Sequence, residues 1–479
     1  MSVKEYDVIV IGSGPNGFSA AITLQQQGLS TLLIEGTDTI GGGMRTKELT
    51  LPGFKHDICS AIHPMAMASP FFSSLPLDKY GLKFIYAPYQ AAHPLLSGET
   101  ALLHRDLQQT VREFGADGDT YLSLVEPVIN NWEKLARDIM GPLRFPNAPL
   151  LFAKFGLNAL QPATWIAKRF KTEKVRALWG GMAGHGIQPL SNYTTSAIGI
   201  VLAGIGHKYG WPIPVGGSQA IANTLSAHYC AIGGEIAEDY WLTDRADLPK
   251  HKILVLNLTP QQILKIEGLD LTPDFRKQLE RYRQGMGVFK VDWALSNPVP
   301  FKDGRCGQAA TVHLGDTFSE IARNEQLTNN GRLVAKPFVL FTQQSVFDKS
   351  RAPEGKHTAW AYCHVPHGSI SDRTDVIENQ LERYAPGFKD TIIARSTINT
   401  KQLEAYNPNY VGGDINGGVM DILQLYTRPT WRFTPYRTSN RSVYICSSST
   451  PPGGGVHGMS GFHAANTVLK DHYNMEVKI

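Results

Sequence analysis

The first 35 residues constrain the fold more than any other part of the chain. An apolar run of strand type, Asp7–Ile11, leads directly into a glycine turn, GSGPNG at 12–17. A helical stretch from Phe18 to Gln27 follows, and a second strand-type run, Thr31–Ile34, ends at Glu35. Three glycines alone are only a common turn. Strand, glycine turn, helix, strand and acid in this order predict the βαβ unit of a dinucleotide-binding fold.

Each residue type in this unit has a physical reason. Gly12 permits the tight turn, Gly14 lets the backbone approach a pyrophosphate, and Gly17 lets helix and strand pack closely. The residues of the turn predicted to contact the cofactor are Gly12, Gly14, Pro15 and Gly17, and the free N–H groups and positive dipole end of the helix that follows suit phosphates. Glu35, eighteen residues after Gly17, is placed to accept hydrogen bonds from a ribose diol, and it would repel the 2′-phosphate of NADP.

A second glycine cluster, IGGGMRT at 40–46, lies just beyond the acid. Such a run is an ordinary loop when taken alone, but beside the fingerprint it suits a chain that crosses under an extended dinucleotide. Arg45 is able to neutralise a phosphate or to face a flavin. The residues of this cluster that we predict to contact the cofactor are Gly41, Gly42, Gly43, Arg45 and Thr46.

The C-terminal region repeats the order of strand, glycine loop and helix without a second GxGxxG. Val443–Cys446 reads as the strand and Phe462–Asp471 as the helix. The positive end of this helix would stabilise the negative charge of a reduced isoalloxazine ring, so the pattern favours FAD over NAD. A plain glycine turn is the alternative. The loop residues predicted to contact the cofactor are Gly454, Gly455, Val456, His457, Gly458 and Met459.

These motifs together resemble the phytoene desaturase and amine oxidase superfamily of flavoproteins. Four further stretches, at 214–225 (PVGGSQAIANTL), 289–301 (FKVDWALSNPVPF), 351–362 (RAPEGKHTAWAY) and 407–418 (NPNYVGGDINGG), are similar to its phytoene dehydrogenase-related branch. The resemblance covers nearly the whole chain, and it implies FAD in an extended pose, a two-domain fold and an apolar substrate. In the desaturases a proline usually stands where this chain has His457, so the chemistry of carotenoid desaturation is not carried over directly.

We expect an α/β fold: a discontinuous Rossmann-like FAD-binding domain with a mixed α+β substrate domain that carries a helical cap. The chain has 479 residues, more than the roughly 250–300 at which a single core stops growing. The FAD-binding domain is predicted at 1–75, 212–282 and 435–479, and the substrate and cap domain at 76–211 and 283–434. The first of these two insertions reads as mainly helical.

The predicted function is FAD-dependent oxidation or desaturation of an apolar or amphipathic small molecule, with hydride transfer to the flavin N5. Only one dinucleotide fingerprint is present, so we expect oxygen, a quinone or another carrier as the electron acceptor and no tightly bound NAD(P). Three alternatives stay open: isomerisation by reduced FAD, amine oxidation, and a flavin-binding scaffold protein without turnover.

A desaturating flavoenzyme also needs a base for the second proton. His457 is the first candidate, because it lies in the loop placed against the flavin, although a histidine that bonds loop carbonyls explains it as well. Asp292 lies beside Lys290 on a strand of alternating character, and a solvated acid is the alternative reading there. His56 and Asp57 follow the second glycine cluster and complete the set of candidates.

Several other functions have little support in the sequence. The five cysteines contain no CxxC, and His364 and His367 lack partner ligands, so neither a redox-active pair nor a metal site is predicted. A net charge of +4 is too small to argue for nucleic acid. The apolar stretch at 196–206 is too short to span a bilayer, and the N-terminus lacks the layout of a signal peptide, which together predict a cytoplasmic protein.

One stretch permits peripheral membrane contact. Between Leu150 and Phe170, aromatic and aliphatic residues alternate with Lys154, Lys168 and Arg169, a composition that suits a helix lying on anionic lipid. Pro162 interrupts the stretch, and a cap helix that faces the core explains the same pattern.

Overall fold

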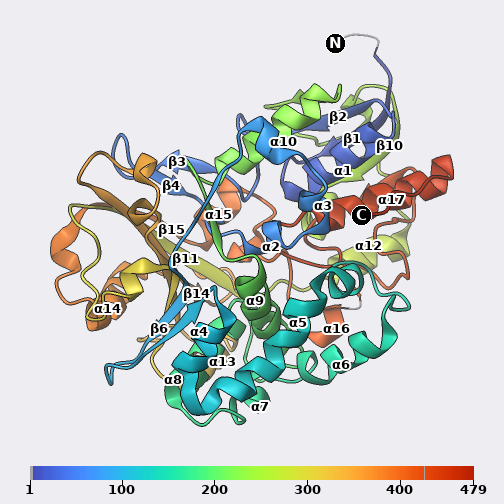
Figure 1. The fold of residues 1–479 in the computed structure, drawn as a ribbon. Helices are drawn as coiled ribbons and strands as arrows, with labels where there is room; N and C mark the ends of the chain where they lie inside the picture. The colour runs from blue at the N-terminus through green and yellow to red at the C-terminus, as the bar shows by residue number, and fades with distance from the viewer. Residues whose placement is uncertain (1–3, 426) are drawn as a thin grey trace.

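The computed structural model describes residues 4–425 and 427–479. Two β-sheets and a helical lobe form the molecule, with the first described strand and the C-terminus on the side of the smaller sheet (Figure 1). This arrangement confirms the predicted α/β class with a Rossmann-like cofactor domain, a mixed substrate domain and a helical cap. The domain boundaries themselves stay a prediction.

The smaller sheet is parallel, with strand order β16-β10-β1-β2-β9. β1 is its centre, because Val8 pairs with Ile253 of β10 on one side and with Thr31 of β2 on the other. Strands from the start, middle and end of the chain therefore meet in one sheet. The strands are β1 (Tyr6–Ile11), β2 (Thr31–Ile34), β9 (Glu235–Ala237), β10 (His251–Leu256) and β16 (Val443–Ile445).

Helices cover both faces of this sheet, which explains why its strands are apolar on both sides. Val8 and Val10 of β1 pack on one face and Ile9 and Ile11 on the other, and all four are buried. The helices of the first face are α1 (Pro15–Gln26), α10 (Gln219–Ala231) and α17 (Met459–Tyr473), and those of the second are α11 (Pro260–Ile263) and α12 (Pro273–Glu280).

Two glycines bring the elements of the cofactor side into close contact. A Cβ added at Gly17 would stand 1.8 Å from the Gly12 carbonyl oxygen, so α1 packs against the glycine turn only because residue 17 has no side chain. A Cβ at Gly461 would stand 1.8 Å from the Asn16 carbonyl oxygen, so α17 approaches α1 in the same way. The C-terminal helix is thereby held against the fingerprint helix.

The larger sheet is mixed, with strand order β15-β11-β14-β13-β12-β6-β7. All nine residues of β11 are buried, and β11 pairs antiparallel with β14 and β15, whereas β12 pairs parallel with β6. The strands are β6 (Tyr89–Pro94), β7 (Thr100–His104), β11 (Gly287–Leu295), β12 (Ala309–Leu314), β13 (Val339–Thr342), β14 (His357–Val365) and β15 (Ile392–Ile398).

The first insertion is mainly helical, as the sequence predicts, and it also supplies β6 and β7 to the edge of the larger sheet. Its helices form the lobe opposite the parallel sheet in Figure 1. They are α4 (Leu107–Phe114), α5 (Gly118–Ile139), α6 (Pro149–Ala159), α7 (Ala163–Ala167), α8 (Glu173–Gly184) and α9 (Thr195–Lys208). In the described residues, no helix is both long and apolar enough to cross a membrane.

Shorter elements connect these layers. Two antiparallel strand pairs and several further helices complete the fold, and α15 contributes Tyr406 to the cavity described below. They are β3 (Thr46–Glu48) with β4 (Lys55–Asp57), β5 (Phe84–Tyr86) with β8 (Pro212–Pro214), and α2 (Pro64–Met67), α3 (Pro70–Ser73), α13 (Phe318–Asn329), α14 (Thr374–Tyr384), α15 (Thr400–Tyr406) and α16 (Ile422–Leu425).

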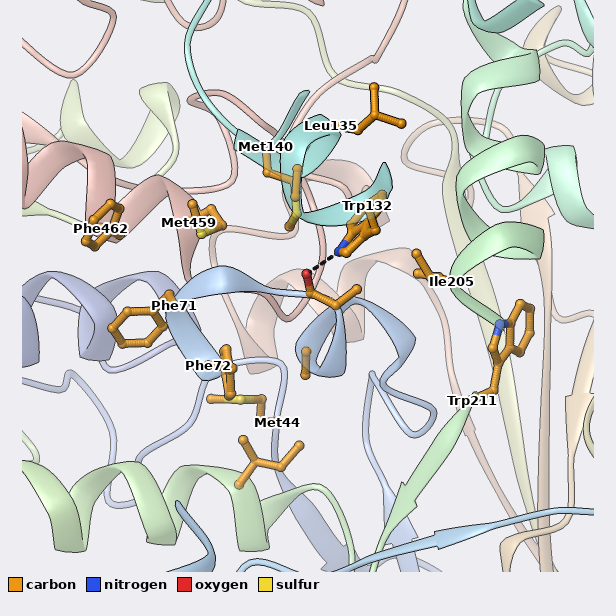
Figure 2. Packing of buried hydrophobic residues seen from close by; sticks show 14 of the residues in the cluster. Met44, Phe71, Phe72, Trp132, Leu135, Met140, Ile205, Trp211, Met459 and Phe462 are labelled. Carbon is orange, nitrogen blue, oxygen red and sulfur yellow. Dashed lines mark hydrogen bonds between the residues drawn. The ribbon is translucent and has the colours of Figure 1, made fainter. Parts of the chain in front are cut away.

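One hydrophobic cluster joins the cofactor side to the helical lobe (Figure 2). Phe71 and Phe72 of α3 and Met459 of α17 share this cluster with Trp132 of α5. The indole of Trp132 also donates to the Ala68 carbonyl oxygen at 2.7 Å, so its buried N–H has a partner at this contact. Truncating a buried tryptophan of this kind costs about 3–5 kcal/mol, so the contact makes a large contribution to the joint between the two parts.

Candidate cofactor-binding and active site

A concave site lies where the strand order of the parallel sheet reverses. From β1 the chain continues to β2 on one side of the sheet, whereas β10 pairs with β1 on the other side. A cavity of about 510 Å³ opens at the carboxyl ends of β1 and β10. Ligands of open α/β sheets bind at such a switch point. Gly12 follows β1 and Asn257 follows β10, and both line the cavity.

The glycine turn forms one wall of the cavity. Gly12 has a φ of +91°, which a residue with a Cβ adopts only under strain, and its carbonyl accepts a hydrogen bond from Asn257 Nδ2 at 3.0 Å. Gly14, Pro15 and Asn16 line the cavity at the start of α1, where the helix offers free N–H groups. The turn is therefore open to a pyrophosphate and is held from behind by Asn257.

Glu35 lines the cavity from the end of β2 and is nearly buried. One carboxylate oxygen accepts from the Ser13 backbone N–H at 3.1 Å and from the Ser13 hydroxyl at 2.5 Å. The other accepts from Thr37 and lies 3.1 Å from Arg45 Nη2. A carboxylate offers about four acceptor directions, so Glu35 can hold this loop together and still accept from a ribose diol. Its negative charge would repel a 2′-phosphate.

The second glycine cluster contacts two tyrosines from a distant part of the chain, Tyr406 and Tyr410. A Cβ at Gly43 would stand 2.6 Å from the Tyr410 hydroxyl, so Tyr410 reaches the cavity only because residue 43 is glycine. The Tyr406 hydroxyl donates to the Gly42 carbonyl oxygen at 3.2 Å, and the Arg45 guanidinium lies 5.4 Å from the centre of the Tyr406 ring. The stretch at 406–418, which the sequence singled out only by resemblance, closes one side of the site.

The C-terminal loop forms the opposite wall. Gly455 and Val456 line the cavity together with Ser447 and Ser448, which follow β16. Gly458 has a φ of +68° and immediately precedes the first turn of α17. The positive end of this fifteen-residue helix therefore lies three residues beyond the cavity residue Val456.

The cavity includes nine of the sixteen residues predicted to contact the cofactor. Those nine are Gly12, Gly14, Pro15, Glu35, Gly42, Gly43, Arg45, Gly455 and Val456. The remaining seven, Gly17, Gly41, Thr46, Gly454, His457, Gly458 and Met459, lie behind the walls. Thr46, for example, donates to Asp57 at 2.6 Å and accepts from the Gln219 backbone N–H at 3.1 Å, which is a structural arrangement.

His457 is one of those seven, and its ring is used by the loop itself. Nδ1 accepts from the Met459 backbone N–H at 3.0 Å, so Nε2 carries the proton and donates to the Gly453 carbonyl oxygen at 3.2 Å. Burial lowers the pKa of His457 to about 4, which keeps the ring neutral. The geometry favours the loop-bonding role over contact with a substrate.

The other three catalytic candidates come together in one buried ionic cluster. Lys290 donates to Asp292 on β11, and the second Asp292 oxygen faces His56 Nδ1 of β4 at 3.5 Å. Asp57, next to His56, accepts from Arg351 at 2.7 Å. The solvated reading of Asp292 is wrong, because Asp292 has no exposed surface and faces His56 of β4.

Charges within the cluster set its protonation. Burial raises the pKa of Asp292 to about 6, because Lys290 offsets only part of the desolvation cost. Burial, with the nearby positive charge of Lys290, lowers the pKa of His56 to about 3. Burial opposes ionisation of Asp57, but the Arg351 guanidinium and three hydrogen bonds outweigh it and hold its pKa below the ordinary value. Asp292 is thus the group in this cluster that exchanges a proton nearest to neutral pH.

Several cavity residues were missed by the sequence reasoning. They are Cys59, Asn257, Asn409, Tyr410 and Ser448. The sequence could have predicted Asn257 as a site residue, since it is the one polar residue in the apolar run 253–258 and follows the carboxyl end of β10. Asn409 accepts from the Thr259 backbone N–H at 2.8 Å across 150 residues, a contact with no local signature.

The histidines and cysteines discussed in the sequence take ordinary structural places. His364 Nδ1 lies 2.6 Å from Glu325, whereas His367 bonds the Gly285 carbonyl oxygen at 3.0 Å. Among residues 4–425 and 427–479, no group of three His, Cys, Asp or Glu side chains is placed to hold a metal ion. The five cysteines are free thiols.

Comparisons with known proteins agree with this geometry. The family described as FAD dependent oxidoreductase matches residues 7–63. The chain is 30% identical to one of the subunits of limonene dehydrogenase from Castellaniella defragrans, with 98% of this chain and 95% of that protein covered. It is 25% identical to mouse pyridine nucleotide-disulfide oxidoreductase domain-containing protein 2, over 98% and 94% of the two chains. A structure of putrescine oxidase bound to putrescine shares the fold, with a TM-score of 0.63, 16% identity and coverage of 98% and 100%.

Proposed function

Because the chain belongs to the phytoene desaturase and amine oxidase superfamily of FAD-dependent oxidoreductases, we propose that this enzyme oxidises or desaturates an apolar or amphipathic small molecule. The observation that carries the substrate class is the composition of one wall of the cavity. Cys59, Tyr410 and Ile415 line it there. Behind them, Ile187 and Val288 form a small apolar cluster with Tyr410.

This wall suits a substrate with few polar groups. Tyr362 of β14 packs against the same cluster and is only partly buried, although it lies in a central strand. Burial raises the pKa of the Cys59 thiol, an effect that the Tyr410 hydroxyl and the Lys290 charge partly offset, so the thiol is neutral. The side chains at this end therefore present no charge, and they favour apolar carbon over an ammonium or carboxylate group.

Bound FAD supplies a hydride acceptor at N5, and desaturation also requires a protein group that takes the second proton. The roles of Asp292, His56, Asp57 and His457 as bases stay predictions. Of the four, Asp292 has the pKa best suited to proton exchange near pH 7, at about 6. It does not line the cavity, so no contact between Asp292 and a bound substrate is assigned.

The electron acceptor and the cellular location belong to the same proposal. We propose oxygen, a quinone or another carrier as the acceptor, because only one dinucleotide fingerprint is present in the sequence. A cytoplasmic location is consistent with five cysteines that form no disulfide. Reduction of the flavin by NADH or NADPH is accordingly expected to be slow.

The test is anaerobic mixing of the FAD-loaded enzyme with a panel of terpene hydrocarbons, long-chain alcohols and primary amines, with NADH and NADPH in parallel. Flavin reduction is followed by the loss of its absorbance near 450 nm, an approximate property of the cofactor. The proposal expects saturable reduction by an apolar compound and a product that has lost two hydrogens. Saturable reduction by amines alone, or by a nicotinamide nucleotide alone, would contradict it.

Isomerisation by reduced FAD is the alternative within the same cofactor class, and mass spectrometry separates the two. An isomerase chemically reduced beforehand would convert its substrate without change in mass and without net reoxidation of the flavin. A desaturase in the same experiment would not turn over until an acceptor is added.

A further inference from the structure

A basic segment with no acidic residue lies in the helical lobe. Residues 141–171 contain five basic side chains and no Asp or Glu. All five are exposed, and Arg169 bonds only the side-chain oxygens of Asn158 and Gln161. The five are Arg144, Lys154, Lys168, Arg169 and Lys171. Their charges are therefore free to interact with an acidic surface.

The same segment exposes large apolar side chains. α6 reads PLLFAKFGLNA, yet Ala159 is its only buried residue among those described. Leu150 is 89% exposed and Leu157 is 73% exposed, and seven residues bring them to the same side of the helix. Lys154 lies between them, four residues from one and three from the other, so its apolar stem runs over the same face.

The exposure is concentrated in this segment. Six of the fifteen exposed large apolar side chains in the described part of the chain lie within these 31 residues. Single exposed apolar residues need no explanation, whereas a contiguous group marks an interaction site. The six are Leu143, Phe145, Leu150, Leu157, Leu160 and Trp165.

The segment is nevertheless part of the fold. Asp138 of α5 accepts from the Asn147 backbone N–H at 2.9 Å, just before α6 begins. Leu151 and Phe155, on another side of α6 from Leu150 and Leu157, are half-buried against the main hydrophobic cluster. α6 and α7 lie along the same edge of the molecule in Figure 1. The apolar side chains thus project from a helix that is held in place.

We propose that residues 141–171 form a peripheral membrane-binding surface for an anionic lipid bilayer. α6 has eleven residues, too few to span a bilayer, so it lies in the plane of the interface with Leu150 and Leu157 among the upper acyl chains. Lys154 reaches back to the headgroups, and the other basic residues meet anionic lipid. The other exposed apolar side chains of the segment, such as Phe145 at 85% exposure, enter the same fluid phase.

This inference does not depend on the substrate class, and lipid vesicles test it directly. The FAD-loaded protein is sedimented with phosphatidylcholine vesicles and with vesicles that contain about 30% phosphatidylglycerol. We expect binding to the anionic vesicles, weakened by salt. Leu150→Ser with Leu157→Ser, and separately Lys154→Glu with Lys168→Glu, should each lower the partition coefficient at least about tenfold.

The matched control is Lys349→Glu with Ile370→Ser, which changes an exposed lysine and an exposed isoleucine elsewhere. It should bind vesicles as the unchanged protein does, and all variants should keep their FAD because the altered side chains are exposed. No binding to anionic vesicles, or binding by both patch variants equal to that of the unchanged protein, would overturn the proposal. So would a patch variant that dissociates an oligomer in analytical ultracentrifugation with no effect on lipid binding, since the surface would then be a protein interface.

Discussion

Glu35 faces the cofactor cavity while Ser13, Thr37 and Arg45 hold its two oxygens. Replacing it by glutamine keeps the shape, removes the charge that pairs with buried Arg45, and leaves a poorer acceptor for a ribose diol. We expect Glu35→Gln to weaken FAD binding by about 1–3 kcal/mol, measured by titrating FAD into the apoprotein. Glu48→Gln, at an exposed carboxylate on β3, is the control and should bind normally. Equal affinity in both variants would remove Glu35 from the site.

His457 tests whether the C-terminal loop carries catalysis or only structure. Its ring accepts from Met459 and donates to Gly453, so His457→Ala leaves two buried backbone groups without partners. We expect a loss of about 1–3 kcal/mol in the free energy of unfolding. Flavin reduction, once a substrate is known, should slow less than about tenfold, whereas loss of a general base slows it about 10²–10⁴-fold. Stopped-flow reduction together with a urea titration separates the two outcomes.

At the scale of elements, α17 depends on one glycine. A Cβ at Gly461 would collide with the backbone of Asn16, whereas a Cβ at Gly156 in α6 would meet only Leu160 Cδ1 at an ordinary 3.9 Å. Both glycines lie inside helices, where alanine is intrinsically better by about 0.5–1 kcal/mol. We therefore expect Gly156→Ala to raise the melting temperature or leave it unchanged. Gly461→Ala should lower it and release FAD, because α17 must move away from α1. Retained FAD with an unchanged melting temperature in the second variant would contradict the packing argument.

The elements that local sequence predicts best are those with a local cause. β1, the glycine turn, α1 and β2 follow from apolar runs and turn chemistry within 35 residues, and the structure has them within one to three residues of the predicted bounds. β6 and β7 were not foreseen in the helical insertion. Their short runs become strands only because β12, more than 200 residues later, pairs with β6.

The same division holds in the site. The glycine turn and Glu35 belong to the local pattern of strand, turn, helix and strand that predicts them. Tyr410 reaches the cavity across Gly43, and Asp292 reaches His56 from another sheet, so both depend on how the insertions fold back. Sequence reasoning named Asp292 and His56 separately, without a signal that joined them. His457 was favoured because it is the titratable residue in a glycine loop, and the structure shows its ring turned to that loop.

At the scale of the whole molecule, buried histidines couple the fold to pH. Burial lowers the pKa of seven of them to about 3 or 4, whereas an unfolded histidine titrates near 6.5. Between these values the unfolded chain binds more protons than the folded chain, so stability is complete above about pH 6.5 and falls as the pH drops. The seven are His56, His63, His93, His185, His207, His457 and His463.

The size of the effect follows from the same linkage. Each histidine contributes up to about 1.4 kcal/mol per pH unit within that window, and net stabilities are only about 5–15 kcal/mol. Asp292 acts in the opposite sense, because its pKa of about 6 is raised above the unfolded value, and it offsets about one histidine. We expect the melting temperature to be flat from pH 8 to about 6.5 and to fall steeply toward pH 5, with FAD released in parallel. His463→Gln, which keeps an amide donor for the Met140 carbonyl oxygen, removes one such group and should make the fall shallower. A melting temperature that stays constant down to about pH 5 would show that these histidines take up protons in the folded state.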